Sequence, residues 1–163
     1  MDIARARGTG LPILFLRSRC ALDMKLIGHE VIESLHTMER FMSAAGIVPA
    51  GPPLTVYRGW NTTETTIEVG YPVAEADLAK ADSIVVGGHS PTVDAVMTVH
   101  HGPYALLAGT YAELERQMGA LGMATGTVTW DIYPADPLST PDQERVVDVY
   151  IGISSEDAGK LGS

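Results

Sequence analysis

The chain has 163 residues, of which 45% are apolar and 19% charged, enough for one domain with a single sizeable core. Eleven Lys and Arg against twenty Asp and Glu give a formal net charge of −9. Because the basic residues form no stripe, this balance argues against direct nucleic-acid binding. The single cysteine, Cys20, excludes an internal disulfide and a thiolate-rich metal site and is typical of a cytoplasmic protein. The longest charge-free stretch, 95–112, is interrupted by histidine, glycine and proline, so we expect no membrane span and no membrane partner.

Two helices and eight strands are expected along the chain. Apolar residues recur at helical spacing before Gly46 and again before Gly122, and glycine at these positions tolerates the positive φ that ends a helix. Pro103 suits the first turn of the second helix. The β-prone runs are, in chain order, residues 2–6, 13–17, 54–58, 66–73, 83–87, 96–100, 129–133 and 145–153.

The sequence contains an internal similarity. Residues 38–46 match residues 114–122, with Glu, Arg, Met, Ala and the final Gly identical, and both segments lie on an expected helix. The runs around the two helices correspond as well, with the loop 134–144 as an insertion. We therefore predict a single α+β domain over residues 1–163, made of two ββαββ units (about 2–74 and 83–153) and a tail (154–163). The units should share one antiparallel sheet with the helices on one face.

Alternation along the strands predicts which side chains face the helices. The apolar residues are assigned to the helix face, namely Leu54, Val56, Val69, Trp130, Ile132, Val147, Val149 and Ile151. The opposite face would then carry Thr55, Tyr57, Glu68, Asp131, Tyr133, Asp148 and Tyr150. Such a face is either simply exposed to water or, because tyrosines offer rigid apolar area with a polar tip, the lining of a site for flat aromatic molecules.

Three motifs resemble those of a known family. They are Val-His-His-Gly-Pro-Tyr at 99–104, Trp-Asp-Ile-Tyr at 130–133 with Asp-Pro at 136–137, and Glu-Val-Gly-Tyr-Pro-Val at 68–73. Together with Gly126 they resemble the GyrI-like small-molecule-binding domain, which also serves as the effector-binding domain of MerR-type and AraC-type multidrug regulators. The resemblance covers about residues 2 to 153. It implies two SH2-like units related by pseudo-twofold symmetry, with a cleft between them that accepts hydrophobic, often cationic, aromatic ligands.

The resemblance also implies which residues form the site. The family's pocket acid is typically Glu, and its position corresponds to Asp131, whose side chain is one methylene shorter. Tyr104, Tyr133 and Tyr150 would line the cleft, with Asp148 and Glu68 near its rim. Tyr57, the counterpart of Tyr133 in the first unit, completes the expected ligand-binding set.

Three function classes follow from this resemblance. The first is a stand-alone bacterial binding protein that senses or sequesters amphipathic aromatic cations, needing a partner for any transcriptional effect and no cofactor. The second is a hydrolase that opens cyclopropane-containing genotoxins, with Asp131 and either Tyr133 or Tyr104 as catalytic residues. The third is a protein-binding role of the gyrase-inhibitor kind. The sequence leaves the ligand, the oligomeric state and the choice between turnover and binding open.

Other chemistry-bearing motifs have simpler explanations. Residues 29–33 begin like a zincin motif but have glutamate where its second histidine would stand. His29, Glu33 and His36 share a helix face that could bind a metal, but we expect a solvated face and no metal site. The segment 88–92 lacks the closing glycine of a nucleophile elbow and is expected to be a turn. His100, which precedes the second helix, is expected to be structural.

Overall fold

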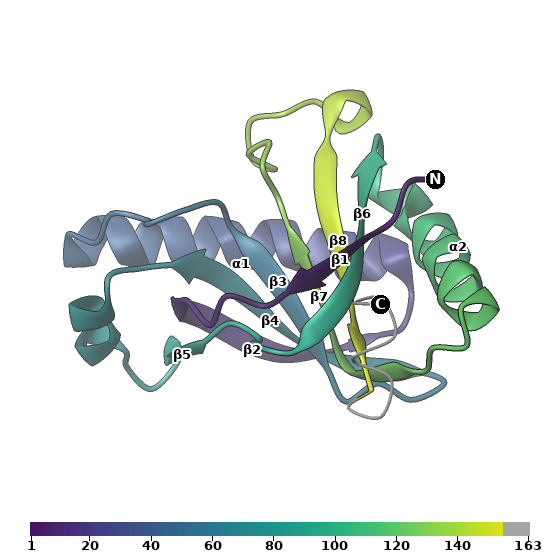
Figure 1. The fold of residues 1–163 in the computed structure, drawn as a ribbon. Helices are drawn as coiled ribbons and strands as arrows, with labels where there is room; N and C mark the ends of the chain where they lie inside the picture. Colours follow the sequence, from purple (N-terminus) through teal and green to yellow (C-terminus); the bar gives the residue numbers. More distant parts are fainter. Residues whose placement is uncertain (155–163) are drawn as a thin grey trace.

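The protein is described by a computed structural model, in which residues 1–154 are placed; the predicted tail from residue 155 onward lies outside the described residues. Within them, eight strands form one antiparallel sheet in the order β1-β6-β8-β7-β3-β4-β2-β5. The strands are β1 (Ala4–Arg7), β2 (Pro12–Ala21), β3 (Leu54–Arg58), β4 (Glu64–Pro72), β5 (Val86–His89), β6 (Asp94–His101), β7 (Thr125–Ile132) and β8 (Val146–Ile153). The helices are α1 (Met24–Ala45) and α2 (Leu107–Ala120), with three short 3₁₀ turns η1 (Glu75–Lys80), η2 (Tyr104–Leu106) and η3 (Asp142–Glu144) (Figure 1). The predicted α+β class, both helices and all eight strands are confirmed.

The helices end at the predicted glycines, whereas α2 begins four residues after Pro103, beyond η2. The Asp23 carboxylate accepts hydrogen bonds from the first backbone N–H groups of α1, at 2.9 Å from Lys25 N and 3.2 Å from Leu26 N. Gly46 ends this helix with φ of 70°, and Gly122 follows α2 with φ of 73°. Pro103 stands directly before η2, which leads into α2.

The first strand of each predicted unit, β1 or β5, pairs with a strand of the other unit. β1 pairs with β6 of the second half, with Ala4 opposite Met97, whereas β5 pairs with β2 of the first half, with Phe15 opposite Val86. From either edge to the centre the order is equivalent, β1-β6-β8-β7 on one side and β5-β2-β4-β3 on the other. A duplicated unit would give this order, although duplication itself stays a prediction.

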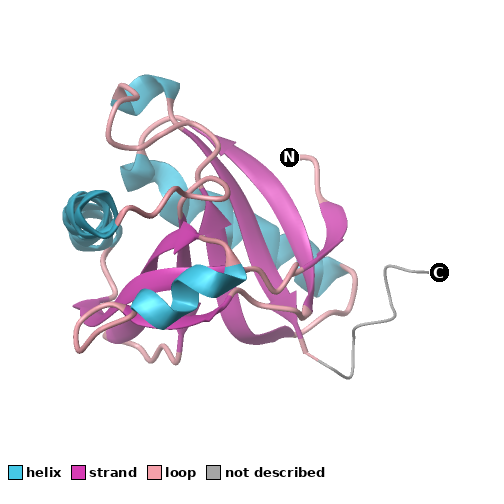
Figure 2. Cartoon of the chain, turned by 90° about the vertical axis from the view of Figure 1, so that its left-hand side faces the viewer, coloured by secondary structure: helices cyan, strands magenta, loops and turns pink. Residues whose placement is uncertain are grey.

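Both faces of the sheet are buried. One face packs against the helices, whose inward residues Ile27, Val31, Leu35, Met38, Leu114 and Met118 belong to the larger core cluster. The opposite face carries a second cluster, formed by Ile13, Phe15, Leu54, Val56, Ala95, Val128 and Trp130. Figure 1 shows the β1–β2 and β5–β6 connections in front of the sheet and α1 behind it, and Figure 2 shows α1 end-on beside the strands.

The two connections that cover the second cluster are bonded to each other. The backbone N–H of Gly8 donates to Val93 O at 3.0 Å, and that of Ser90 donates to Leu11 O at 2.8 Å. Their approach is so close that a Cβ at Gly8 would lie 1.9 Å from Pro91 O. The crossing therefore requires glycine at position 8.

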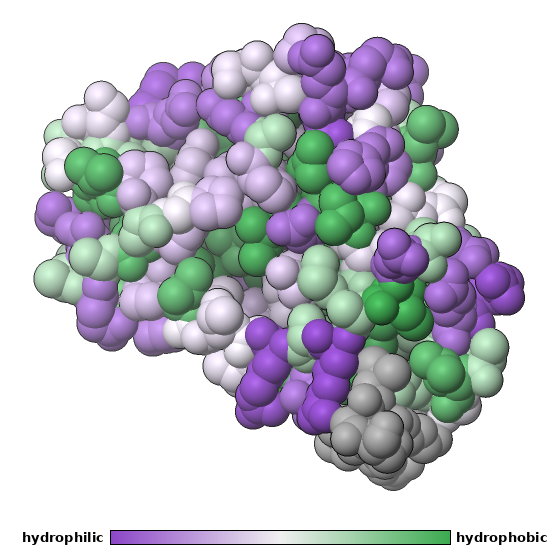
Figure 3. All heavy atoms as spheres, turned by 45° about the horizontal axis from the view of Figure 1, so that its top comes forward, coloured by the Kyte–Doolittle hydropathy of each residue, from purple (hydrophilic) through white to green (hydrophobic). Residues whose placement is uncertain are grey.

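The outer surface mixes polar and apolar residues. On the face shown in Figure 3, hydrophobic residues form small groups between hydrophilic ones. None of the helices within residues 1–154 combines the length and the apolar character needed to cross a lipid bilayer.

Candidate functional site

Asp131 lies at the centre of the sheet, on the face that packs against the helices. In the register of β3 and β7, Thr55 pairs with Asp131 and Tyr57 pairs with Thr129. Directly paired residues of antiparallel strands point to the same face, so Thr55, Tyr57 and Asp131 all lie beneath the helices. Tyr133, two residues beyond Asp131, points the same way and extends the group.

The Asp131 carboxylate is fully buried and unevenly bonded. Its Oδ2 atom accepts hydrogen bonds from the hydroxyls of Tyr57, at 3.0 Å, and Tyr111. Its Oδ1 atom is buried and has no hydrogen-bond partner among the described residues. Burial raises the pKa of Asp131 to about 7, although the bonds from Tyr111 and Tyr57 oppose this change by favouring the ionised form.

Four tyrosines surround this carboxylate. The hydroxyls of Tyr133 and Thr55 share a hydrogen bond of 2.6 Å, and the ring centroids of Tyr57 and Tyr111 lie 6.2 Å apart in an edge-to-face arrangement. The Tyr104 ring lies 5.5 Å from that of Tyr133, and its hydroxyl is buried without a partner among residues 1–154. Burial raises the pKa of all four phenols, so they stay neutral hydrogen-bonding groups near pH 7.

One cation of the protein already lies on this aromatic group. The Arg145 guanidinium carbon lies 4.3 Å from the centroid of the Tyr104 ring. Arg145 is held there by Asp142, at 2.7 Å, and by the carbonyl oxygen of Pro137, at 3.2 Å. Such a contact is a cation–π interaction, and it shows that the tyrosine group presents a ring face to positive charge.

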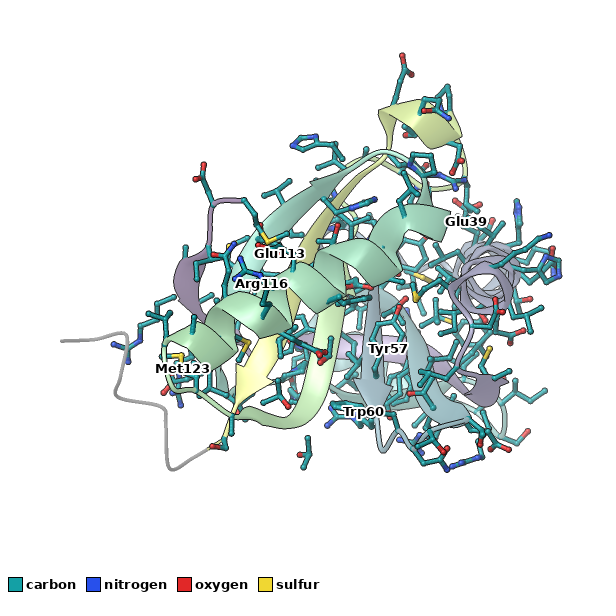
Figure 4. The ribbon with its side chains drawn as sticks, turned by 90° about the vertical axis from the view of Figure 1, so that its right-hand side faces the viewer. Glu39, Tyr57, Trp60, Glu113, Arg116 and Met123 are labelled. Atoms are coloured by element: carbon teal, nitrogen blue, oxygen red, sulfur yellow. The ribbon has the colours of Figure 1, made fainter. Side chains whose placement is uncertain are left out.

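A pocket of about 250 Å³ opens beside the carboxylate. It lies between the start of α1, the β3–β4 hairpin and α2, and its lining residues are Leu22, Met24, Ile27, Tyr57, Trp60, Thr65, Tyr111, Glu115 and Thr129. Tyr57 and Tyr111 belong both to this lining and to the Asp131 hydrogen bonds, so they join the pocket to the buried acid. Figure 4, in which α1 is seen end-on, shows Tyr57 in the space between α2 and α1, with Trp60 below it in this view.

The structure brings four of the seven predicted site residues together. Asp131, Tyr57, Tyr104 and Tyr133 form the group described above. The other three, Glu68, Asp148 and Tyr150, lie on the opposite face of the sheet, as their register partners Val56, Ile132 and Trp130 show.

Two of these three residues, Glu68 and Tyr150, have side-chain partners of their own on that face. Glu68 is buried between Arg17 and Arg58, with nitrogen–oxygen distances of 2.7 Å and 2.9 Å. The Tyr150 ring stacks on Trp130 with centroids 5.0 Å apart and planes 1° from parallel. Their ligand-binding role stays a prediction, but they cannot share a site with Asp131 through one face of the sheet.

The strand-face prediction is therefore wrong for β3 and β7 and right for β4 and β8. Leu54, Val56 and Trp130 pack in the second cluster, away from the helices, whereas Val69 and Val149 pack beneath them as predicted. The physical reason is that both faces are buried. Polarity therefore does not mark the outer face, and the polar residues of β3 and β7 line a buried site instead.

Sequence reasoning missed Tyr111, Trp60 and Glu115. Tyr111 fits the helical spacing of apolar residues in α2, where a tyrosine is unremarkable as packing. The available signal was its hydroxyl, because a tyrosine in a helix stripe buries a polar group that needs a partner on the facing strand. Trp60 lies in the β3–β4 hairpin and is 40% exposed, and no pattern in the sequence places this hairpin beside α2.

His100 and Ser90 have structural roles, as expected from their surroundings. The buried His100 ring bonds Thr110 Oγ1 through Nδ1 at 2.7 Å and the Pro103 carbonyl oxygen through Nε2 at 3.0 Å. Since a carbonyl only accepts, Nε2 carries the proton and the ring fastens the entry to α2. The Ser90 hydroxyl accepts from Leu11 N at 2.8 Å and so belongs to the crossing of the two connections.

The fold is that of the GyrI-like effector-binding domains. The chain is similar to the C-terminal domain of EcmrR, with a TM-score of 0.76 and 16% identity over 94% of this chain and 97% of that domain. In the EcmrR–DNA complex the matching part is 57% of the EcmrR chain, so the chain spans little more than half of that regulator.

Two further structures share the fold. SAV2435, solved with bound tetraphenylphosphonium, has a TM-score of 0.64 and 10% identity over 96% of both chains. A hydrolase from Listeria innocua has a TM-score of 0.58 and 16% identity over 94% of this chain and 92% of that one. No family model and no curated protein sequence matches the chain.

Proposed function

We propose that the protein binds hydrophobic organic cations, with the aromatic part of the ligand in the pocket and its charge directed at Asp131. The observation that carries this proposal is a fully buried carboxylate, enclosed by tyrosines and joined to a pocket through two of them. A protein interior rarely retains an acid with no cationic partner, because burial disfavours its charged form. A cation from outside would supply the missing partner.

Simple energetics favour this class of ligand. A cation over a tyrosine face gains about 0.5–2 kcal/mol, and apolar area contributes about 25 cal/mol per Å² when it is removed from water. A pocket of about 250 Å³ accepts a two- or three-ring aromatic system in part, with the remainder against Trp60 and Leu22 at the surface. These terms together support micromolar affinity. The tetraphenylphosphonium complex of SAV2435 shows that this fold can hold an aromatic cation.

Binding should depend on the charge of Asp131. With a pKa of about 7, the carboxyl group is largely protonated at pH 6 and largely ionised at pH 8. A cation prefers the ionised form, so its affinity should rise as the pH rises through 7. Below pH 7, binding should release a proton. Sensing and sequestration would use the same site. They differ in whether the ligand-bound protein acts on a partner or only retains the ligand.

The proposal is tested by titrating a fluorescent hydrophobic cation such as a rhodamine, following its anisotropy. Wild type, Asp131→Asn and the matched control Asp148→Asn are compared at pH 8, because Asp148 is an acid of the same sheet on the opposite face. We expect saturable binding by wild type and Asp148→Asn, and at least about a tenfold loss in Asp131→Asn. Equal affinity of all three proteins, or equal binding of an uncharged analogue, would contradict the proposal.

One observation favours a hydrolase as the second candidate. Asp131 has a pKa of about 7 and an oxygen without a hydrogen-bond partner among residues 1–154, and it accepts a hydrogen bond from the Tyr111 hydroxyl. These are the properties of a general base with a neighbouring proton donor. It would accept a proton from water while the water oxygen attacks a strained-ring carbon and the opened ring carbon takes up a proton. Product formation beyond one equivalent, detected by mass spectrometry and absent in Asp131→Asn, would establish this activity; stoichiometric binding alone would exclude it for the substrate tested.

A further inference from the structure

The two oxygens of the Asp131 carboxylate differ in their hydrogen bonding. Oδ2 accepts from both the Tyr57 and Tyr111 hydroxyls, whereas Oδ1 is buried and accepts from no group among residues 1–154. A charged oxygen out of water is the strongest acceptor in a protein interior, and leaving it without a donor is costly. Among residues 1–154, the Asp131 carboxylate therefore lacks both a hydrogen-bond donor at Oδ1 and an ion-pair partner.

The position of the pocket also indicates that the ligand must supply a hydrogen-bond donor. Tyr57 and Tyr111 line the pocket and donate to Oδ2, so a ligand approaching from the pocket meets the carboxylate at these two hydroxyls. A ligand that displaces one hydroxyl removes a hydrogen bond from Oδ2, and Oδ1 already has no donor among residues 1–154. The carboxylate then needs a donor from the ligand.

We propose that this site selects cations that carry an N–H group, such as protonated tertiary amines and amidiniums, over quaternary ammonium or phosphonium ions of the same shape. The inference rests on the proposed function and names the ligand class within it. An N–H cation gives Asp131 both charge and a directed hydrogen bond. A quaternary ion gives charge alone and leaves an oxygen unsatisfied.

The alternative mechanism predicts the opposite preference. If only stacking and charge acted, a quaternary ion would bind more tightly, because its extra methyl group adds apolar area worth roughly a fourfold gain in affinity. It would also lose less hydration than an N–H cation. A hydrogen bond to a buried charged group is worth about tenfold to a hundredfold, which exceeds these opposing terms. The sign of the preference thus separates the two mechanisms.

The test is a calorimetric titration of wild type with a matched pair, a tricyclic aromatic bearing a dimethylaminopropyl chain and its trimethylammonium analogue. At about pH 8 Asp131 is ionised, since its pKa is about 7, and both ligands are cations. We expect the dimethyl compound to bind at least about tenfold more tightly. In Asp131→Asn the ratio should fall towards one, because the acceptor is no longer charged, whereas Asp148→Asn should keep the wild-type ratio.

Each of the other possible results contradicts either the N–H preference, its assignment to Asp131 or the proposed function. Equal binding of the pair, or tighter binding of the quaternary compound, overturns the N–H preference while the proposed cation binding stands. A ratio that persists in Asp131→Asn overturns the assignment of the preference to this carboxylate. If neither compound binds to wild type, both the inference and the proposed function fail. The wild-type comparison needs no variant, so folding defects cannot obscure it.

Discussion

Ionisation of Asp131 should destabilise the protein in the absence of ligand. Burial raises the pKa of this carboxyl group from 3.8 to about 7, so the folded state holds a proton that the unfolded state releases between these two values. Folding stability is therefore greatest at low pH with respect to this group and declines as the pH rises from about 4 to about 7. Above pH 7 both states are ionised and the loss is complete.

The size of this effect follows from the difference in pKa. A change from 3.8 to about 7 is close to three pH units, and each unit corresponds to about 1.4 kcal/mol, so the full cost is on the order of 4 kcal/mol. Between pH 5 and pH 8 this group lowers the free energy of unfolding by about 2.5 kcal/mol. That is a large fraction of the 5–15 kcal/mol typical of a folded domain.

The assay compares urea unfolding of wild type and Asp131→Asn at intervals from pH 5 to pH 8. Taking the difference between the two proteins cancels the groups that titrate in both. We expect the free energy of unfolding of wild type to fall by about 2.5 kcal/mol relative to the variant over this range, and a saturating cationic ligand to reverse the fall. A difference that stays constant with pH would refute the claim that the carboxyl group is protonated in the folded protein near neutrality.

Three further predictions concern two glycines, the pocket residue Glu115 and the hydrogen bond from Tyr111 to Asp131. Gly8→Ala should lower the free energy of unfolding by about 1–3 kcal/mol, because its Cβ would collide with the facing backbone, whereas Gly109→Ala, with no atom within 4 Å of the added Cβ, should raise it by about 0.5–1 kcal/mol; thermal unfolding measures both. Glu115→Gln should slow cation association about two- to threefold at low salt, with the difference vanishing at high salt in stopped-flow measurements. Tyr111→Phe removes a hydrogen bond that favours the ionised form, so the pH midpoint of cation binding should move upward by about one unit, and an unchanged midpoint would show that the Tyr111 hydroxyl does not act on Asp131.

The fold was largely predictable because its signals are local. Helical apolar spacing, the caps at Gly46 and Gly122 and the β-prone runs each depend on neighbouring residues, and all correspond to observed elements. The strand exchange was not predictable in this way. Pairing of β1 with β6 joins residues more than eighty positions apart, and nothing in either run specifies its partner.

The site was predictable in part, for a different physical reason. Asp131 and Tyr133 were identified through a motif, and their helix-facing orientation was missed because alternation assumes that polar residues face water. That assumption holds for a sheet with one face exposed to water, and it fails here because the crossing connections lie against Trp130 and Leu54. Tyr111 was missed for another reason. It both packs in α2 and donates a hydrogen bond to Asp131, but in the sequence it cannot be distinguished from a residue that only packs.

The exchange of the leading strands makes each half of the chain incomplete alone. Until β5 is present, residues 12–15 of β2 have an unpaired edge, and until the chain reaches β6, β1 has no strand to pair with. During synthesis β1 therefore cannot pair until more than half of the chain has been made. A cut between η1 and β5 would leave two fragments, each lacking a strand that pairs with its own sheet: β5 for the first and β1 for the second. Such fragments should assemble with one another rather than fold separately, which makes the two halves obligate partners even though they belong to one polypeptide.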